Sequence, residues 1–316
     1  LPHLELAIQI AAQATVEDAA FRVVFAGMGM TNADADLVRQ GLENRTRTGE
    51  ASLFLNTADD PVIERILTPR LALTVAEHLA FDLGHHVLVI LSDMTSYSDA
   101  VRQLSAARGE VPSRRGYPGY LFSDLASIYE RCGRLENQPG SITELPVLTM
   151  PAGDITHPVP DLTGYITEGQ LVLSADLHSR DIYPPIDALA SLSRLMRRGA
   201  GPGRTRDDHL AIAAQLLALL AQARKAEELA ALIGLDALSM TEQRYLDLGH
   251  RFETQFTDQG RTESRDLSTT LERAWMTAAA VPVRELTMVT PEQIAQNLPR
   301  PELGAGESPA SEESPT

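Results

Sequence analysis

Cysteine, lysine and long apolar runs are nearly or wholly missing from this chain. Cys132 is the only cysteine among 316 residues, so no disulfide can form within the chain, which fits a reducing compartment. No apolar run approaches the roughly 20 residues that span a bilayer. The first residues contain no basic leader followed by an apolar stretch, so we expect no export signal. These absences predict a cytoplasmic protein.

Positive charge is also scarce. The chain has 27 Lys and Arg against 43 Asp and Glu, which gives a formal net charge of −16. Nucleic acid attracts basic proteins through its phosphates, so this balance argues against nucleic acid as the main partner. Arginine supplies nearly all of the cations. This reflects either genomic base composition or a preference for planar, bidentate contacts, and we favour the first interpretation.

Strands and helices alternate through the first two thirds of the sequence. We expect strands over residues 21–26, 52–56, 87–91, 145–150 and 170–173. We expect helices over residues 4–14, 31–44, 69–83, 97–107 and 119–132, with a further short helix opened by Pro61. Leu4, Ile8, Ala11 and Ala12 would share the buried face of the first helix. The alternation predicts an α/β fold with a mostly parallel sheet between helical layers.

The pattern changes after about residue 194. Three helical segments follow, over residues 209–232, 241–257 and 267–280, and no convincing strand interrupts them. We therefore predict an α/β core over residues 1–196 and an all-helical domain over 197–297, with Gly199–Thr205 as a hinge. Residues 298–316 are rich in Pro, Glu, Ser and Gly, a composition that cannot bury enough apolar surface, so we predict a disordered tail.

Two segments of the α/β core point to different conclusions about chemistry. The apolar strand that ends in Asp93 looks like the strand that carries the magnesium-side aspartate of nucleoside triphosphatases. We expect a turn at Gly27–Met28–Gly29, where such an enzyme would hold a carboxylate to orient the attacking water. Met28 offers a thioether there, which can neither accept a proton nor polarise water. Together they suggest a nucleotide-hydrolase fold that has lost its chemistry.

Five longer stretches, over residues 53–70, 110–120, 154–170, 182–187 and 191–196, strengthen this interpretation. They include LFLNTADDPVIERILTPR, EVPSRRGYPGY and DITHPVPDLTGYITEGQ, and the last two read IYPPID and SLSRLM. Together they resemble the non-catalytic B subunit of the vacuolar/archaeal-type rotary ATPase, also called the beta chain of V-type ATP synthase. The resemblance extends over about residues 1–280.

The resemblance implies a fold of the RecA-like ring-ATPase type followed by the helical domain. It implies a regulatory B subunit of a proton- or sodium-translocating ATPase or ATP synthase. Three copies would alternate with three catalytic A subunits, with ATP or ADP at the interface and Mg²⁺ held by the partner. Central and peripheral stalk subunits would be further partners, and the membrane would be reached only through partner subunits.

The chain departs from that family at several positions. Relatives have a β-barrel and the first half of the sheet domain before this point, so we expect an N-terminally truncated chain or a fold without a central strand. Leu1–Leu4 would align with the end of a phosphate loop. There His3 replaces the phosphate-binding lysine and Leu4 replaces the hydroxyl residue that ligates magnesium. Ala152–Gly153 also replaces a more polar pair.

Arg194 is the principal candidate residue. By resemblance it is the arginine finger that reaches the nucleotide of the neighbouring catalytic subunit; the alternative is a surface arginine on a helix C-terminus. Asp93, Arg115 and Tyr117 are candidates for weak nucleotide contacts. Asp93 either holds magnesium-bound water or ends a buried strand as a structural acid, which we favour. Arg114, Arg115 and Tyr117 lie either at a subunit interface or in a solvated loop. The histidines lack metal-ligand spacing, so we predict no metal site.

Three other functions remain open. An autonomous nucleoside triphosphatase would need a phosphate-loop lysine and a catalytic acid. An RNA translocase on the same ring fold would need a basic channel, which the net charge of −16 opposes. An inactive pseudoenzyme fragment without a role in assembly is the third.

Overall fold

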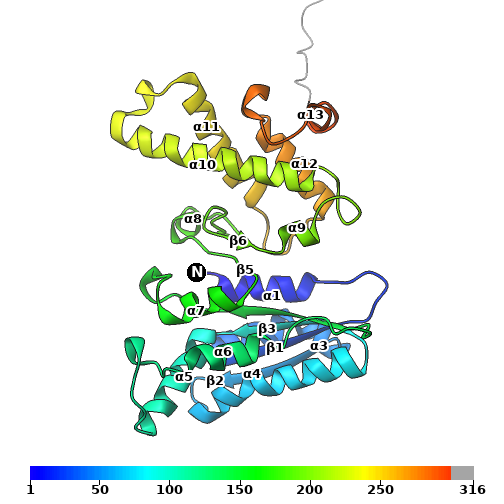
Figure 1. The fold of residues 1–316 in the computed structure, drawn as a ribbon, viewed down its shortest axis with the longest axis vertical. Coiled ribbons are helices and arrows are strands. Elements are labelled where there is room, and N and C mark those ends of the chain that lie inside the picture. Colours follow the sequence, from blue (N-terminus) through cyan, green and yellow to red (C-terminus); the bar gives the residue numbers. More distant parts are fainter. Residues whose placement is uncertain (300–316) are drawn as a thin grey trace, which may run out of the picture. The chain divides into compact units, whose positions relative to one another are not determined.

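The computed structural model describes residues 1–299, which separate into two compact units (Figure 1). Among the described residues, unit 1 comprises Leu1–Leu195 together with Asp258–Ser264, and unit 2 comprises Met196–Thr257 and residues 265–299. The predicted disordered tail lies almost entirely outside the described residues. No helix within residues 1–299 is long and apolar enough to cross a bilayer.

Unit 1 alternates strands and helices. Its elements are α1 (His3–Gln13), β1 (Phe21–Met30), α2 (Asn32–Gly41), α3 (Glu43–Arg47), β2 (Ala51–Thr57), α4 (Val62–Glu77), the π-helical turn η1 (His78–Asp82), β3 (His86–Ser92), α5 (Met94–Ala107), η2 (Arg114–Gly116), α6 (Leu121–Tyr129), β4 (Ser141–Val147), η3 (Pro151–Gly153), α7 (Pro158–Ile166), β5 (Gly169–Gln170), α8 (Ala175–Ser179) and β6 (Leu192–Ser193).

The main sheet is parallel and has the strand order β2-β1-β3-β4. Alternate residues of β1 and β3 enter two separate cores, because successive side chains of a strand point to opposite faces. Val24 and Val89 pack with α4, α5 and α6, whereas Phe25 and Ile90 pack with α1 and α2. Helices thus cover both faces, which explains the continuous apolar run of β3. The predicted α/β fold class is confirmed.

Two predicted breaks are wrong. The expected turn at residues 27–29 is part of β1, which continues to Met30: β3 pairs with β1 as far as Gly27, and β2 pairs with it again at Met30. The register with β2 shifts between Gly27 and Met30, where Gly29 has a φ of +66°. The break expected before Pro69 is also absent, since α4 runs through it. Pro69 is buried on the same helix face as Leu73, so core packing compensates for the missing N–H.

Several predicted boundaries are also wrong. β4 begins at Ser141 instead of residue 145, because it pairs along the whole of β3. α5 begins at Met94, immediately after Asp93, and α6 begins at Leu121. In α1, Ala7 is buried while Ala12 is exposed, so the buried face is rotated from the predicted one.

Unit 2 is helical, as expected. Its elements are α9 (Met196–Gly199), α10 (His209–Ile233), η4 (Leu235–Ala237), α11 (Met240–Arg251), the π-helical turn η5 (Phe252–Thr257), α12 (Leu267–Ala278), η6 (Val283–Glu285) and α13 (Pro291–Asn297). A buried carboxylate, that of Asp208, links side chains in the core of unit 2. Asp208 accepts hydrogen bonds from Trp275 Nε1 at 2.6 Å and from Arg206 Nε and Nη2 at 2.6 and 2.8 Å.

Candidate functional site

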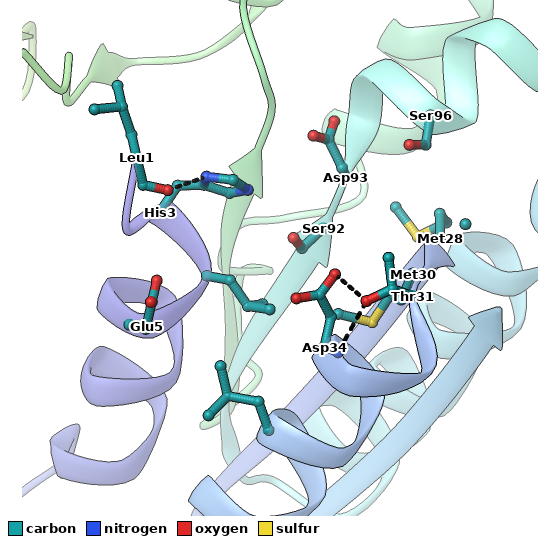
Figure 2. A pocket seen from close by; sticks show the side chains of 13 residues that line it. Leu1, His3, Glu5, Met28, Met30, Thr31, Asp34, Ser92, Asp93 and Ser96 are labelled. Carbon is teal, nitrogen blue, oxygen red and sulfur yellow. Dashed lines mark hydrogen bonds between the residues drawn. The ribbon is translucent and has the colours of Figure 1, made fainter. Parts of the chain in front are cut away.

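A cavity of about 310 Å³ lies at the carboxyl ends of β1 and β3, beside the start of α1 (Figure 2). Its lining residues are Leu1, His3, Leu4, Glu5, Met28, Gly29, Met30, Thr31, Asp34, Leu37, Ser92, Asp93 and Ser96. Parallel α/β sheets bind ligands outside the carboxyl ends of their strands, so this is the expected place for a nucleotide. The cavity brings together His3, Leu4, Met28 and Asp93, the residues that the sequence analysis compared with positions of a nucleotide site.

The charges around this cavity do not fit nucleotide phosphates. Glu5, Asp34 and Asp93 contribute three carboxyl groups, and the described lining contains no lysine or arginine. His3 is the only side chain there that could become cationic, and its Nδ1 lies 2.9 Å from the carbonyl oxygen of Leu1. A phosphate site needs cations or free backbone N–H groups. The described lining has no lysine or arginine, and its free N–H groups are those at the start of α1, whose N-cap Pro2 makes no side-chain hydrogen bond.

Asp93 caps a helix. It is the N-cap of α5, and its Oδ1 accepts a hydrogen bond from the backbone N–H of Thr95 at 2.6 Å. This contact satisfies one of the unpaired N–H groups at the start of the helix. Asp93 thus holds the start of α5, which is a structural role. Met28 is 1% exposed and packs in the core on the α4–α5 side of the sheet.

Arg115 and Tyr117 are not among the residues that line the cavity. Arg115 donates from Nη2 to Asp154 Oδ2 at 2.6 Å. A hydrogen bond from Thr156 and this contact with Arg115 lower the pKa of Asp154 to about 2. Tyr117 is buried and its hydroxyl donates to Asp99 at 3.0 Å, while burial raises its pKa to about 12. Both side chains are therefore engaged within their own chain.

Arg194 lies at the end of a two-stranded ribbon, where β6 pairs with β5. Its backbone N–H donates to the carbonyl of Glu168 at 2.8 Å. Its side chain is exposed, although Nη1 donates to the carbonyls of Gly164 and Thr167. Like Arg115, it does not line the cavity. The structure thus separates Arg194 from the residues at the carboxyl ends of the strands.

Sequence reasoning missed two features. One is the end of α7, which meets Arg194 through backbone carbonyls, and no residue type signals such a contact. The other is Glu144 in β4. Its two carboxylate oxygens are buried and have no hydrogen-bond partner among the described residues. Ile142 and Glu144 lie before the strand predicted over residues 145–150, so the sequence analysis did not place them on one face; the observed β4 does, because alternate residues of a strand share a face. No group of three or more metal-ligating side chains occurs within residues 1–299.

Comparison with known proteins identifies the family. Residues 1–193 match the ATP synthase alpha/beta family, nucleotide-binding domain, and residues 198–298 match the C-terminal domain of V and A type ATP synthase. The chain is 50% identical over 301 residues to the B subunit of the A-type ATP synthase of Methanosarcina acetivorans. This match covers 95% of the chain, which spans 65% of that relative's length.

A solved structure agrees with this assignment. NeqB, an ATP synthase subunit from Nanoarcheaum equitans, is 44% identical, with a TM-score of 0.82. That match covers 89% of this chain and 69% of the other. The chain therefore belongs to the ATP synthase alpha/beta family and is a homologue of the B subunit of A/V-type ATP synthases.

Proposed function

We propose that this chain acts as the non-catalytic B subunit of an A/V-type ATP synthase or ATPase. It alternates with catalytic A subunits in a three-plus-three ring and donates Arg194 to the ATP site of the neighbouring subunit. The observation that best supports this proposal is the exposed guanidinium of Arg194, held at the end of the β5–β6 ribbon and away from the chain's own cavity.

An arginine suits this role because of the charge distribution in phosphoryl transfer. Negative charge spreads over several oxygens in the transition state, and a planar guanidinium supplied in trans stabilises it. Such a finger raises turnover on the order of a thousandfold or more. ATP or ADP would lie at the interface, with Mg²⁺ held by the partner subunit.

The chain's own cavity supports a non-catalytic role. Met28 and His3 both line this cavity. By the resemblance, they take the places of the water-orienting carboxylate and of the phosphate-binding lysine of a hydrolase. We therefore expect the purified chain to hydrolyse no ATP. Steady turnover that a substitution within this cavity abolishes would contradict the proposal.

The proposed partners follow from the family. They are the A subunit, central and peripheral stalk subunits, and, through these alone, the membrane, so that the protein works at the cytoplasmic side of a proton- or sodium-translocating complex. The B subunit lacks a base and the A subunit supplies one. We therefore expect co-expression to give a mixed ring, as measured by native mass spectrometry. Stable homo-hexamers that exclude the A subunit would contradict this arrangement.

The decisive experiment is Arg194→Ala in the complex with the A subunit. We expect turnover to fall strongly while ring yield and nucleotide affinity change little, because the finger acts on charge that develops in the transition state. Arg194→Lys should also fail, since a point charge on a flexible stem cannot reproduce a two-pronged contact. Arg39→Ala, which removes another exposed arginine paired within its own chain, is the control.

Ring yield and turnover are measured on the same preparation. If Arg194 serves only its own chain, through Gly164 and Thr167, then Arg194→Ala lowers melting temperature or ring yield and the surviving rings turn over normally. Normal turnover in intact Arg194→Ala rings would refute the proposal.

A further inference from the structure

The guanidinium of Arg194 is anchored on one side only. Both of its side-chain hydrogen bonds use Nη1, which donates to the carbonyls of Gly164 and Thr167. Within residues 1–299, Nε and Nη2 have no hydrogen-bond partner. One edge of the guanidinium plane is therefore held by backbone, and the other edge is left to bind a group outside the chain.

These two carbonyls lie where a helix is best able to hold a cation. α7 ends at Ile166 and Thr167 is its C-cap, so Gly164 and Thr167 lie at the helix C-terminus. The last carbonyls of a helix lack intrahelical partners, and the helix macrodipole places partial negative charge there. The end of α7 thus attracts the guanidinium without a carboxylate, which would neutralise the charge needed at the neighbouring site.

The hydroxyl of Thr167 connects this helix end to the ribbon that carries Arg194. Its Oγ1 lies 2.9 Å from the carbonyl oxygen of Thr163 and 3.3 Å from that of Gly169, the first residue of β5. Gly169 in turn pairs with Ser193, next to Arg194. One hydroxyl therefore helps to fix the carbonyl of its own residue relative to the backbone of the ribbon.

We propose that Thr167 is a positioning residue for Arg194: it fixes the C-terminal turn of α7, whose carbonyls hold Nη1 and so present Nε and Nη2 to the neighbouring subunit. This inference rests on the proposed function of Arg194. Arginine has a long, flexible side chain, and holding it in one geometry before the reaction removes an entropic cost from the transition state.

The test is Thr167→Val in the complex with the A subunit. Valine keeps the shape of threonine and removes the hydroxyl. We expect kcat to fall about fivefold, as for the loss of one ordinary hydrogen bond, with KM for ATP nearly unchanged. In the Arg194→Ala background the same substitution should cause no further loss of turnover, because there is no guanidinium left to position.

Thr48→Val is the matched control. Thr48 is the C-cap of α3, and its exposed hydroxyl likewise donates to the carbonyl four residues earlier, at 3.1 Å. It does not contact Arg194, so kcat should be unchanged. Melting temperatures of all variants show whether each retains its fold.

The outcomes separate the two proposals. Normal turnover of Arg194→Ala would refute the proposed function and, with it, the positioning role. Slow turnover of Arg194→Ala together with normal turnover of Thr167→Val would refute the positioning role alone. An equal loss from Thr167→Val in both backgrounds would also refute it, because Thr167 would then act independently of Arg194.

Discussion

Glu144→Gln should remove a pH dependence from the stability of unit 1. Glu144 lies in β4, paired with Val89 of β3, and both of its carboxylate oxygens are buried without a hydrogen-bond partner among the described residues. Burial raises the pKa of this carboxyl from 4.5 to about 8, and Arg131 partly opposes the shift. Tyr129 and Cys132 also lie close enough for its charge to raise the pKa of each.

The sign follows from proton binding. Between pH 4.5 and 8 the folded chain keeps the proton of Glu144 and the unfolded chain has lost it. The free energy of unfolding therefore falls as pH rises through this range and levels off above pH 8. Each pH unit lowers the free energy of unfolding by about 1.4 kcal/mol, so between pH 4.5 and 7.5 the total loss is on the order of 4 kcal/mol.

Other groups oppose this slope only at lower pH. The pKa values of His85 and His157 are lowered from 6.5 by burial, so folding gains stability as pH rises toward 6.5. Above pH 6.5 they are largely neutral in both states. The clearest window is therefore pH 6.5–8, in which Glu144 alone should lower the free energy of unfolding by about 2 kcal/mol.

The assay is urea unfolding at several pH values, followed by tyrosine fluorescence and circular dichroism. Trp275 is the only tryptophan and lies in unit 2, so its fluorescence follows the other unit separately. The slope should vanish in Glu144→Gln and persist in Glu136→Gln, which alters an exposed glutamate. Equal slopes for the original chain and Glu144→Gln between pH 6.5 and 8 would refute the reasoning.

Three further predictions concern Arg131, Asp208 and Gly169. Arg131→Met should raise the pKa of Glu144 further and extend the fall in stability above pH 8, because Arg131 is the charge that lowers it; an unchanged pH profile would contradict this. Asp208→Ala should cost unit 2 about 3 kcal/mol, since Arg206 and Trp275 both lose their buried acceptor, and an unshifted unfolding midpoint by Trp275 fluorescence would count against it. Gly169→Ala should separate β5 from β6, because the new Cβ would lie 2.7 Å from the carbonyl oxygen of Leu192. Turnover of the assembled ring should then fall toward that of Arg194→Ala. The circular dichroism of the main sheet should not change.

Local patterns in the sequence determined the fold class. The alternation of strands and helices, the apolar run of β3 and the strand-free segment after residue 194 predict a parallel sheet followed by a helical domain, because each depends on neighbours along the chain. Thr31, at the start of the helix predicted over residues 31–44, is the N-cap of α2, and its hydroxyl accepts a hydrogen bond from the N–H of Asp34. The long collinear stretches were sufficient to identify the family.

Only the tertiary structure decided where strands and helices end and which contacts individual side chains make. Pairing of Met30 with β2, beyond a shift in register after Gly27, extends β1 past Met28, and burial in the core lets α4 continue through Pro69. Burial also raises the pKa of Glu144, and the carbonyls that hold Arg194 come from residues about 30 positions away. Every residue type has the same backbone carbonyl. The sequence therefore does not predict contacts to these groups, which are known only from the folded structure.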